Sequence, residues 1–162
     1  DMLILAWART YGINYLILRP TNNYGIGQYP EKLIPVTVKL LMRGKKIKLH
    51  DKGMPIRNWL HSDDTASAVV ALIESGAKNE IFNVAGGFEQ ENIATVNKVL
   101  EEYFGEKRDW SEFLDLTHVR EGQDIRYALN DDKLRSLDWK PEKKFDEEVK
   151  KIVEYYKHNF KW

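Results

Sequence analysis

The repeated succession of a short strand-like segment and an amphipathic helix is the feature that most restricts the fold of this chain. Segments 14–20 (NYLILRP), 56–61 (IRNWLH) and 80–87 (EIFNVAGG) are short and largely apolar, and a helical pattern follows each of them. Such runs, bounded by polar residues or glycines, are typical of buried strands. Strands that alternate with helices favour an α/β fold with parallel pairing.

The expected helices have recognisable ends. Pro30 and Glu31 suit the first turn of one helix, and Ser62 or Asp63 can cap the next. A third helix ends at Gly105, and a fourth carries the apolar residues of 145–156. The side chains that these four helices are expected to bury are Leu33, Ile34, Val38, Leu41, Ala66, Val69, Val70, Ile73, Ile93, Val96, Leu100, Phe104, Phe145, Val149, Ile152, Val153 and Tyr156.

The two ends of this pattern are less regular. Residues 2–11 read as the second half of a helix that stops at Gly12, so we expect the chain to begin within a helix of a longer protein; a short native protein with a processed start is the alternative. Residues 45–50 resemble another strand. The second half favours an α+β elaboration, with an irregular stretch at 106–115, short strands at 116–119 and 125–129 around a loop, and a short helix at 131–137.

Charge and composition exclude several functional classes. The chain has 25 basic and 25 acidic residues, so no overall field recruits nucleic acid or an anionic membrane. It has no cysteine, which excludes disulfides, a thiolate nucleophile and a cysteine–zinc site, and fits the cytoplasm. No apolar stretch approaches the ~20 residues of a membrane span. The four histidines lack ligand spacing, so no metal site is expected.

The connection 19–35 (RPTNNYGIGQYPEKLIP) concentrates proline, glycine and asparagine, which suits a loop that presents amides to a ligand. Asn22 and Asn23 fall at the carboxyl end of a predicted strand, where open α/β sheets bind ligands. A side-chain amide there can donate to a phosphate and accept from a hydroxyl. An Asx turn is the alternative interpretation.

Three more polar residues are candidates for ligand contacts. Arg57 stands in a strand-like run, where a guanidinium facing inward would bind an anion such as phosphate; an exposed edge position is the alternative. Asn83 interrupts an apolar strand and needs a partner there. Arg120 precedes a glycine-containing loop that could close over a phosphate, unless it is simply solvated.

No complete catalytic or dinucleotide motif accompanies these residues. Gly25 and Gly27 lack the third glycine of the dinucleotide fingerprint and follow a loop rather than open a helix. No nucleophile or paired acid and base is specified by the residues alone.

The order of the motifs is more informative than any one of them. The succession RPTNNYG, YPEKLIP, KGMPIRNWLHSDD, FNVAGG and VREGQDIRYALNDDKLRSLDWKP resembles the C-terminal half of the nucleotide-sugar dehydratases of the extended short-chain dehydrogenase/reductase superfamily, over essentially the whole chain. The resemblance implies the terminal part of an NAD-binding Rossmann fold, interleaved over residues 1–162 with a smaller α+β substrate-binding domain. The N-terminal half with the NAD fingerprint would be absent.

The resemblance also implies roles for particular residues. Asn23 would lie against the nicotinamide end of NAD. Arg57 would clasp the diphosphate, and Arg120 with its loop would cover the nucleotide. The residues expected to contact the nucleotide-diphosphate sugar are Asn22, Glu31, Lys32, Leu33, Lys48, His50, Arg57, Asn83, Arg120 and Gln123. Lys48, His50 and Gln123 depart from the residues common in the family, which leaves the nucleobase open.

In that family the whole enzyme oxidises the sugar at C4 by hydride transfer to NAD, eliminates water across C5 and C6, and returns the hydride to C6. The family's Tyr-x-x-x-Lys pair and acid/base carboxylates lie upstream of this region, so we expect no catalytic residue here, no turnover by the chain alone, and a homodimer only for the full-length enzyme. A UDP-sugar 4-epimerase or decarboxylase, and a non-catalytic module that binds a sugar nucleotide, are the alternatives.

Overall fold

The computed structural model describes residues 1–159 as an α/β arrangement of three small sheets and several packed helices. β1 pairs with β5, β2 with β4 and β3 with β7, all in parallel, as the alternating pattern predicts. β6 is antiparallel to β4, and β8 runs parallel to it. The strands are β1 (Leu16–Pro20), β2 (Asn22–Tyr24), β3 (Ile47–His50), β4 (Ile56–His61), β5 (Glu80–Val84), β6 (Phe88–Glu91), β7 (Leu114–His118) and β8 (Arg126–Tyr127).

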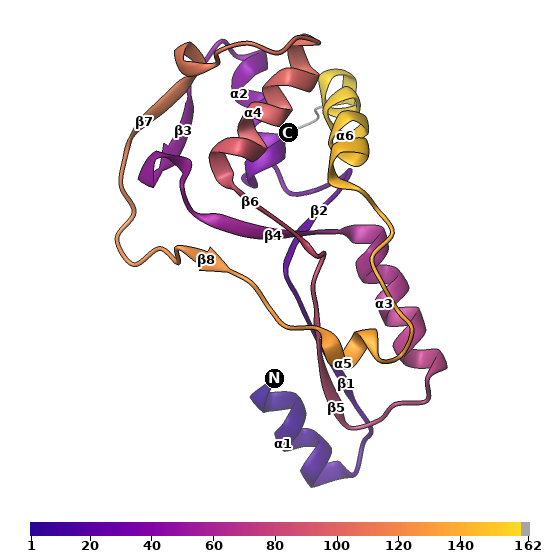
Figure 1. Ribbon diagram of the computed structural model, residues 1–162. Helices are drawn as coiled ribbons and strands as arrows, with labels where there is room; N and C mark the ends of the chain where they lie inside the picture. Colours follow the sequence, from indigo (N-terminus) through magenta and orange to yellow (C-terminus); the bar gives the residue numbers. More distant parts are fainter. Residues whose placement is uncertain (160–162) are drawn as a thin grey trace.

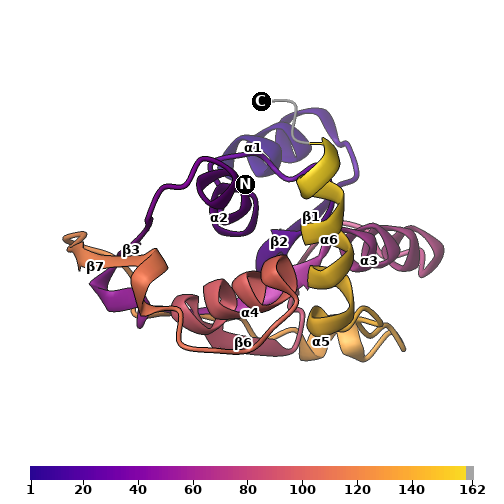
Figure 2. The same cartoon turned by 90° about the horizontal axis from the view of Figure 1, so that it is seen from above.

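The helices lie at two ends of the molecule. Figure 1 shows α2, α4 and α6 together at one end and α1 beside β1 and β5 at the other. In both views β3 and β7 lie on the side opposite α3 (Figures 1 and 2). The helices are α1 (Met2–Tyr11), α2 (Leu33–Met42), α3 (Ser62–Glu74), α4 (Asn92–Phe104), α5 (Asp132–Arg135) and α6 (Phe145–Asn159), with short 3-10 turns η1 (Asp51–Gly53) and η2 (Ser111–Phe113).

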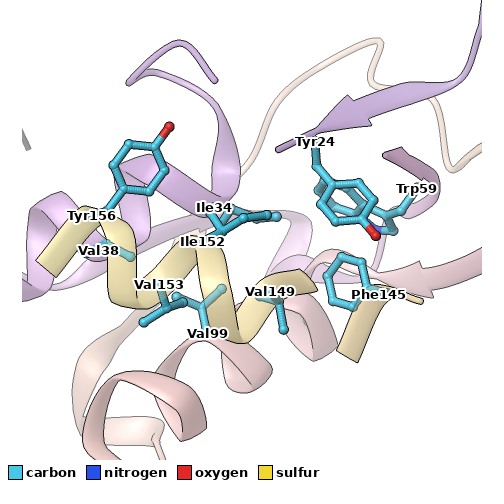
Figure 3. Close-up of a cluster of buried hydrophobic side chains, with 10 residues drawn as sticks. All are labelled: Tyr24, Ile34, Val38, Trp59, Val99, Phe145, Val149, Ile152, Val153 and Tyr156. Carbon is cyan, nitrogen blue, oxygen red and sulfur yellow. The ribbon is translucent and has the colours of Figure 1, made fainter. Parts of the chain in front are cut away.

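The largest hydrophobic cluster joins the three-helix end to the central sheet (Figure 3). Trp59 of β4 and Tyr24 of β2 meet Phe145 at the start of α6, with ring centroids 5.1–6.0 Å apart. The complete cluster is Tyr24, Ile34, Val38, Trp59, Val99, Phe145, Val149, Ile152, Val153 and Tyr156. The buried residues predicted for the last helix are therefore confirmed, because its apolar stripe packs on α2 and α4.

Two further clusters cover the other sheets. One lies under α3 and α5, with Phe82 and Val84 of β5 and Trp139 among its members. The other packs β3 and β7 against α4, where Val96 and Leu100 are fully buried as predicted. Of the other two residues predicted for α4, Ile93 is partly buried, and Phe104 is 41% exposed and stacks on Trp110.

The connection 19–35 is more ordered than the sequence suggests. Asn22, Asn23 and Tyr24 form β2, which pairs with β4, where a loop was predicted. The following helix starts at Leu33 rather than at Pro30, because Lys32 still has extended backbone angles (φ −76°, ψ 154°). Tight turns therefore occupy the residues between β2 and α2.

The predicted apolar face of α3 is wrong. Val69, Val70 and Ile73 are 38–67% exposed, whereas Ala68 and Leu72 are completely buried. The reason is tertiary: Asp64, on the same face as these two, accepts the main-chain amides of residues 142 and 143 and fixes which side of the helix faces inward. The face that the apolar pattern of the helix alone predicts to be buried is therefore exposed to solvent.

The predicted caps of α3 are also corrected. Neither Ser62 nor Asp63 caps the helix; His61 does, because its Nδ1 accepts the Asp63 amide at 3.2 Å. β6 was not predicted, and the irregular stretch 106–115 contains η2 and the start of β7. β7, β8 and α5 differ from the predicted boundaries by a few residues.

The N-terminal helix α1 contributes nothing to the core. It has no buried residue, and Met2, Leu3, Trp7 and Tyr11 are all more than half exposed. It ends as predicted at Gly12, which has a left-handed conformation (φ 66°). In the described part of the chain, no helix combines the length and apolarity that crossing a bilayer requires.

Candidate functional site

Asn22 and Asn23 lie side by side on β2 but are used differently. The Asn23 side chain donates to the Thr21 carbonyl at 3.0 Å and accepts from the Thr65 hydroxyl at 2.6 Å. The half-buried Asn22 side chain has no hydrogen-bond partner among residues 1–159. The Asn23 amide thus ties β2 to α3, and the Asn22 amide keeps its full capacity for a ligand.

Arg57 lies in the middle of the central sheet and is half-buried. Its Nη1 donates to two main-chain carbonyls, those of Ile56 at 2.7 Å and Asp124 at 3.1 Å. A guanidinium has five N–H donors, so the donors on Nε and Nη2 stay without a partner in the described structure. The two bonds hold the side chain in place without neutralising its charge.

The loop 119–125 is attached directly to this strand. Besides the Arg57 bond, the Ile125 carbonyl accepts the Ile56 amide at 2.8 Å. Arg120 and Gln123 lie on this loop and line one hollow of about 250 Å³. The residues lining this hollow are Asp51, Met54, Pro55, Arg120, Gly122, Gln123 and Ile125.

Lys48 and His50 lie on β3, next to the strand that leads into that loop. His50 pairs with His118 of β7, with ring centroids 6.2 Å apart, and Lys48 pairs with Asp115. Both predicted side chains are exposed. Three hydrogen bonds, from the Thr117 side chain, the Thr117 amide and the His118 ring, lower the pKa of Asp115 to about 2. Its carboxylate therefore stays charged beside the Lys48 position at neutral pH.

The other predicted residues lie further from this group. Asn83 is on β5, in a separate sheet, and its side chain donates to the Asn130 carbonyl at 3.0 Å. Glu31 and Lys32 are exposed in the turn before α2, and Leu33 packs on two of the hydrophobic clusters. No side chain caps the start of α2 within residues 1–159, and a helix N-terminus of this kind suits an anion.

The structure thus brings together some of the predicted residues and not others. Arg57 is bonded to the loop of Arg120 and Gln123, and Lys48 and His50 lie on the strand beside that loop's origin. No hydrogen bond joins Asn22 or Asn83 to that group within residues 1–159. The hollow at Arg120 is lined by neither of these asparagines nor by Arg57.

Sequence reasoning missed two polar residues next to this group. Asn58, only 4% exposed, accepts bonds from the Thr21 hydroxyl and the Gly86 amide. Arg126 forms a bidentate pair with Glu89, at 2.8 and 3.0 Å. The signal for Asn58 was an amide within a strand-like run, the same signal that singled out Asn83.

Comparison with known proteins points to one family. A model of the family described as "NAD dependent epimerase/dehydratase family" matches residues 1–85, more than half of the chain. The dTDP-glucose 4,6-dehydratase 1 of Escherichia coli K12 is 36% identical over 166 residues, which cover 100% of this chain and 46% of that protein. A dTDP-glucose 4,6-dehydratase of Neisseria meningitidis is 35% identical over 170 residues, 100% of this chain and 48% of that protein.

Solved structures give the same result. DesIV, a dTDP-glucose 4,6-dehydratase from Streptomyces venezuelae with NAD and TYD bound, matches with a TM-score of 0.87 and 34% identity over 98% of this chain and 48% of its own. UDP-glucose 4-epimerase from Thermotoga maritima, with UDP-glucose, matches with a TM-score of 0.82 and 25% identity over 99% of this chain and 51% of its own. The chain spans about half the length of the relatives it matches.

The family model and the shared parallel strand–helix arrangement therefore agree with the motif order read from the sequence. This chain belongs to the NAD-dependent epimerase/dehydratase family.

Proposed function

We propose that this chain forms the sugar-nucleotide-binding portion of an NAD-dependent dTDP-glucose 4,6-dehydratase. The observation that carries the proposal is the Arg57 guanidinium, which main-chain carbonyls hold in a half-buried position without neutralising it. A guanidinium with donors to spare can bind a diphosphate in bidentate fashion. The similarity to dTDP-glucose 4,6-dehydratases supports dTDP as the nucleotide.

In this proposal the other residues position the substrate around that cation. Arg120 and Gln123 approach the nucleotide from the loop bonded to Arg57, and Lys48 and His50 lie towards the nucleobase. The Asn22 amide, which has no partner in the described structure, takes a sugar or phosphate oxygen. Asn83, Glu31, Lys32 and Leu33 complete the substrate contacts. Residues 1–162 then combine the last Rossmann elements with the substrate-binding domain.

The residues of this chain fit only one end of NAD. Asn23 has a single side-chain N–H left after its bond to Thr21, which suits the nicotinamide end. The chain has no dinucleotide fingerprint for the NAD pyrophosphate, since Gly25 and Gly27 lack the third glycine. NAD supplies, when bound, the acceptor and donor of the hydride for oxidation at C4 and return at C6.

This chain's own part in the reaction is to hold the substrate. Two arginines offset the charge of the diphosphate, and the amides restrict the orientation of the sugar, which lowers the entropy cost of reaching the reactive geometry. The proton transfers that accompany elimination across C5 and C6 belong to residues outside this chain. The expected homodimer is part of the same proposal.

A 4-epimerase acting on a UDP-sugar is the second candidate. It is favoured by the likeness to the Thermotoga maritima UDP-glucose 4-epimerase, which extends over 99% of this chain. The two functions differ in the nucleotide they prefer, so comparing dTDP with UDP distinguishes them. Preferential binding of UDP would replace the dehydratase proposal.

The test is titration of the purified chain with dTDP and UDP, followed by NMR chemical shifts. We expect weak binding of dTDP, and Arg57→Gln should weaken it by about tenfold because the variant loses the charge and fork of the guanidinium. Arg43→Gln is the matched control, since Arg43 is exposed at the end of α2. Equal affinities for the two variants would contradict the proposal.

A further inference from the structure

Asn58 makes contacts that reach well beyond its own strand. The side chain is 4% exposed and lies between β2, the turn after β5, and β6. Its Oδ1 accepts the Thr21 hydroxyl at 3.0 Å and the Gly86 amide at 2.9 Å. One carboxamide oxygen thereby holds two segments that are 65 positions apart in the chain.

The same residue also faces β6. Asn58 and Glu89 lie opposite each other in the β4–β6 register. The Arg126 guanidinium, which donates to the Glu89 carboxylate, and after it the Asn58 side chain lower the pKa of Glu89. Glu89 stays ionised, and it binds Arg126 through both carboxylate oxygens.

Each segment that Asn58 reaches carries one of the predicted ligand residues. Thr21 precedes Asn22, and Asn58 itself follows Arg57. Gly86 lies three residues after Asn83. Through Glu89 and Arg126 the network reaches β8, which continues from the loop that carries Arg120.

The predicted ligand residues Asn22, Arg57, Asn83 and Arg120 form no hydrogen bond with one another within the described structure. The Asn58 network adds hydrogen bonds between the backbone segments that bear them, beside the β2–β4 ladder and the bond from Arg57 to the Asp124 carbonyl.

We infer that Asn58, together with the Glu89–Arg126 pair, is a positioning residue that sets the relative places of the segments carrying Asn22, Arg57, Asn83 and Arg120. The inference builds on the proposed function, since those four residues are its substrate contacts. Asn58 does not touch the substrate. It acts by fixing Thr21, just before β2, and the Gly86 turn to one side chain, and it faces Glu89, which holds Arg126 of β8. Separate donors then meet one ligand at defined spacing.

The facing positions of Asn58 and Glu89 in the β4–β6 register make a sharp test feasible. Asn58→Asp keeps an oxygen for Thr21 and Gly86 but sets a carboxylate against the Glu89 carboxylate, which is unfavourable. Adding Glu89→Gln supplies an amide nitrogen that can donate to the carboxylate introduced at position 58. The amide oxygen can still accept from Arg126. The double variant should therefore recover what the single variant loses.

The experiment measures amide hydrogen exchange along the chain, with no ligand, for wild type, Asn58→Asp, Glu89→Gln and the double variant. We expect Asn58→Asp to accelerate exchange about tenfold at Thr21, Gly86, Ile56 and β8, and the double variant to reverse most of this. Asn14→Asp, at an exposed position, is the control. Acceleration confined to β4, or spread equally over α4 and α6, would overturn the inference.

A dTDP titration of the same variants separates the inference from the proposed function. Asn58→Asp should weaken dTDP binding about tenfold, and the double variant should regain it, whereas a merely structural role gives no rescue. If wild type binds no dTDP, the proposed function fails while hydrogen exchange still decides the role of Asn58. If wild type binds dTDP and Asn58→Asp binds equally well, the inference fails alone.

Discussion

At the scale of single residues, Gly86 shows how closely the segments of the candidate site approach one another. A Cβ atom at this position would lie 1.7 Å from the Trp59 carbonyl oxygen and 2.9 Å from the Leu60 Cα. Both are backbone atoms of β4, which cannot move aside as a side chain could. The bond from the Gly86 amide to Asn58 depends on this close approach.

We expect Gly86→Ala to lower the free energy of unfolding by about 3 kcal/mol, because the added methyl group forces β4 and the turn apart. Gly87→Ala is the matched control: its φ of +71° makes alanine strained, but the nearest atom is the end of Arg135 at 3.6 Å. The control should lose about 1 kcal/mol. Urea unfolding compares the two, and equal losses would contradict the steric argument.

Asp115 gives a second residue-scale prediction, based on its pKa of about 2. Thr117→Val removes the hydroxyl that contributes most to lowering this pKa, so the pKa should rise towards the ordinary 3.8. Because the folded state prefers the carboxylate, this contribution to stability is complete above pH 3.8 and disappears as the pH falls to about 2. Carboxyl ¹³C titration measures the change.

Thr10→Val, which removes an exposed threonine hydroxyl on α1, is the control and should leave the pKa of Asp115 unchanged. An unchanged pKa in Thr117→Val would show that the threonine hydroxyl is not the cause.

At the scale of secondary-structure elements, α3 shows that the apolar periodicity of a helix does not by itself predict which face is buried. Its exposed apolar residues Val70 and Ile73 and its buried residues Ala68 and Leu72 belong to the same helix. Asp64 is acidic, yet it lies on the inward side and is only 3% exposed, because two main-chain amides donate hydrogen bonds to its carboxylate. Hydrogen bonding to the chain before α6 thus selects the buried face.

Two neighbouring residues of α3 test this orientation. Leu72→Ala should cost about 3 kcal/mol of unfolding free energy, because it leaves a cavity in a fully buried site. Ile73→Ala, one residue later and 67% exposed, should cost about 0.5 kcal/mol or less. Thermal and urea unfolding of both variants provide the comparison, and a larger loss for Ile73→Ala would reverse the assignment of the faces.

At the scale of the whole molecule, the chain has one well-packed end and one sparsely covered end. α2, α4 and α6 surround the largest cluster, whereas α1 has no buried residue and β1 and β5 form a sheet of only two strands. The family relatives are about twice as long. Asn22, Asn23 and Arg57 lie between these two ends, on β2 and β4, and Arg120 and Gln123 lie on the loop before β8, whereas Asn83 lies on β5 and Lys48 and His50 lie on β3.

Because the family's catalytic residues are expected upstream of this region, the purified chain should convert no dTDP-glucose when NAD is present. Mass spectrometry for the loss of one water from the sugar nucleotide is the measurement. The Escherichia coli dTDP-glucose 4,6-dehydratase, assayed alongside, verifies the reagents. Dehydration by this chain alone would show that it contains an acid and base of its own.

Much of the fold could be predicted because it depends on local patterns. The strands that became β1, β4 and β5 and the buried stripe of α6 follow from apolar spacing, and Gly12 and Gly105 end their helices as their sequence positions indicate. β2 and β6 could not be predicted, because short polar segments become strands only when β4 offers them hydrogen-bond partners.

The candidate site divides in the same way. Arg57 and Asn83 stand out as polar residues within strand-like runs, and Asn22 as an amide in the loop after one. The motif order led to the family that the comparisons bear out. Their assignment to substrate contacts stays a prediction. Asn58 was passed over because its importance depends on Thr21 and Gly86, and only their spatial approach makes it visible.

The sequence by itself determined the alternation of strands and helices, the stripe that α6 buries and the family. Tertiary structure alone decided which face of α3 is buried, that Asn22 and Asn23 join a sheet, and that one carboxamide connects Thr21 with Gly86. The physical reason is the distance along the chain over which each interaction acts. Apolar periodicity and helix capping act within about one or two helical turns. Pairing and buried hydrogen bonds require partners that chain folding alone brings together.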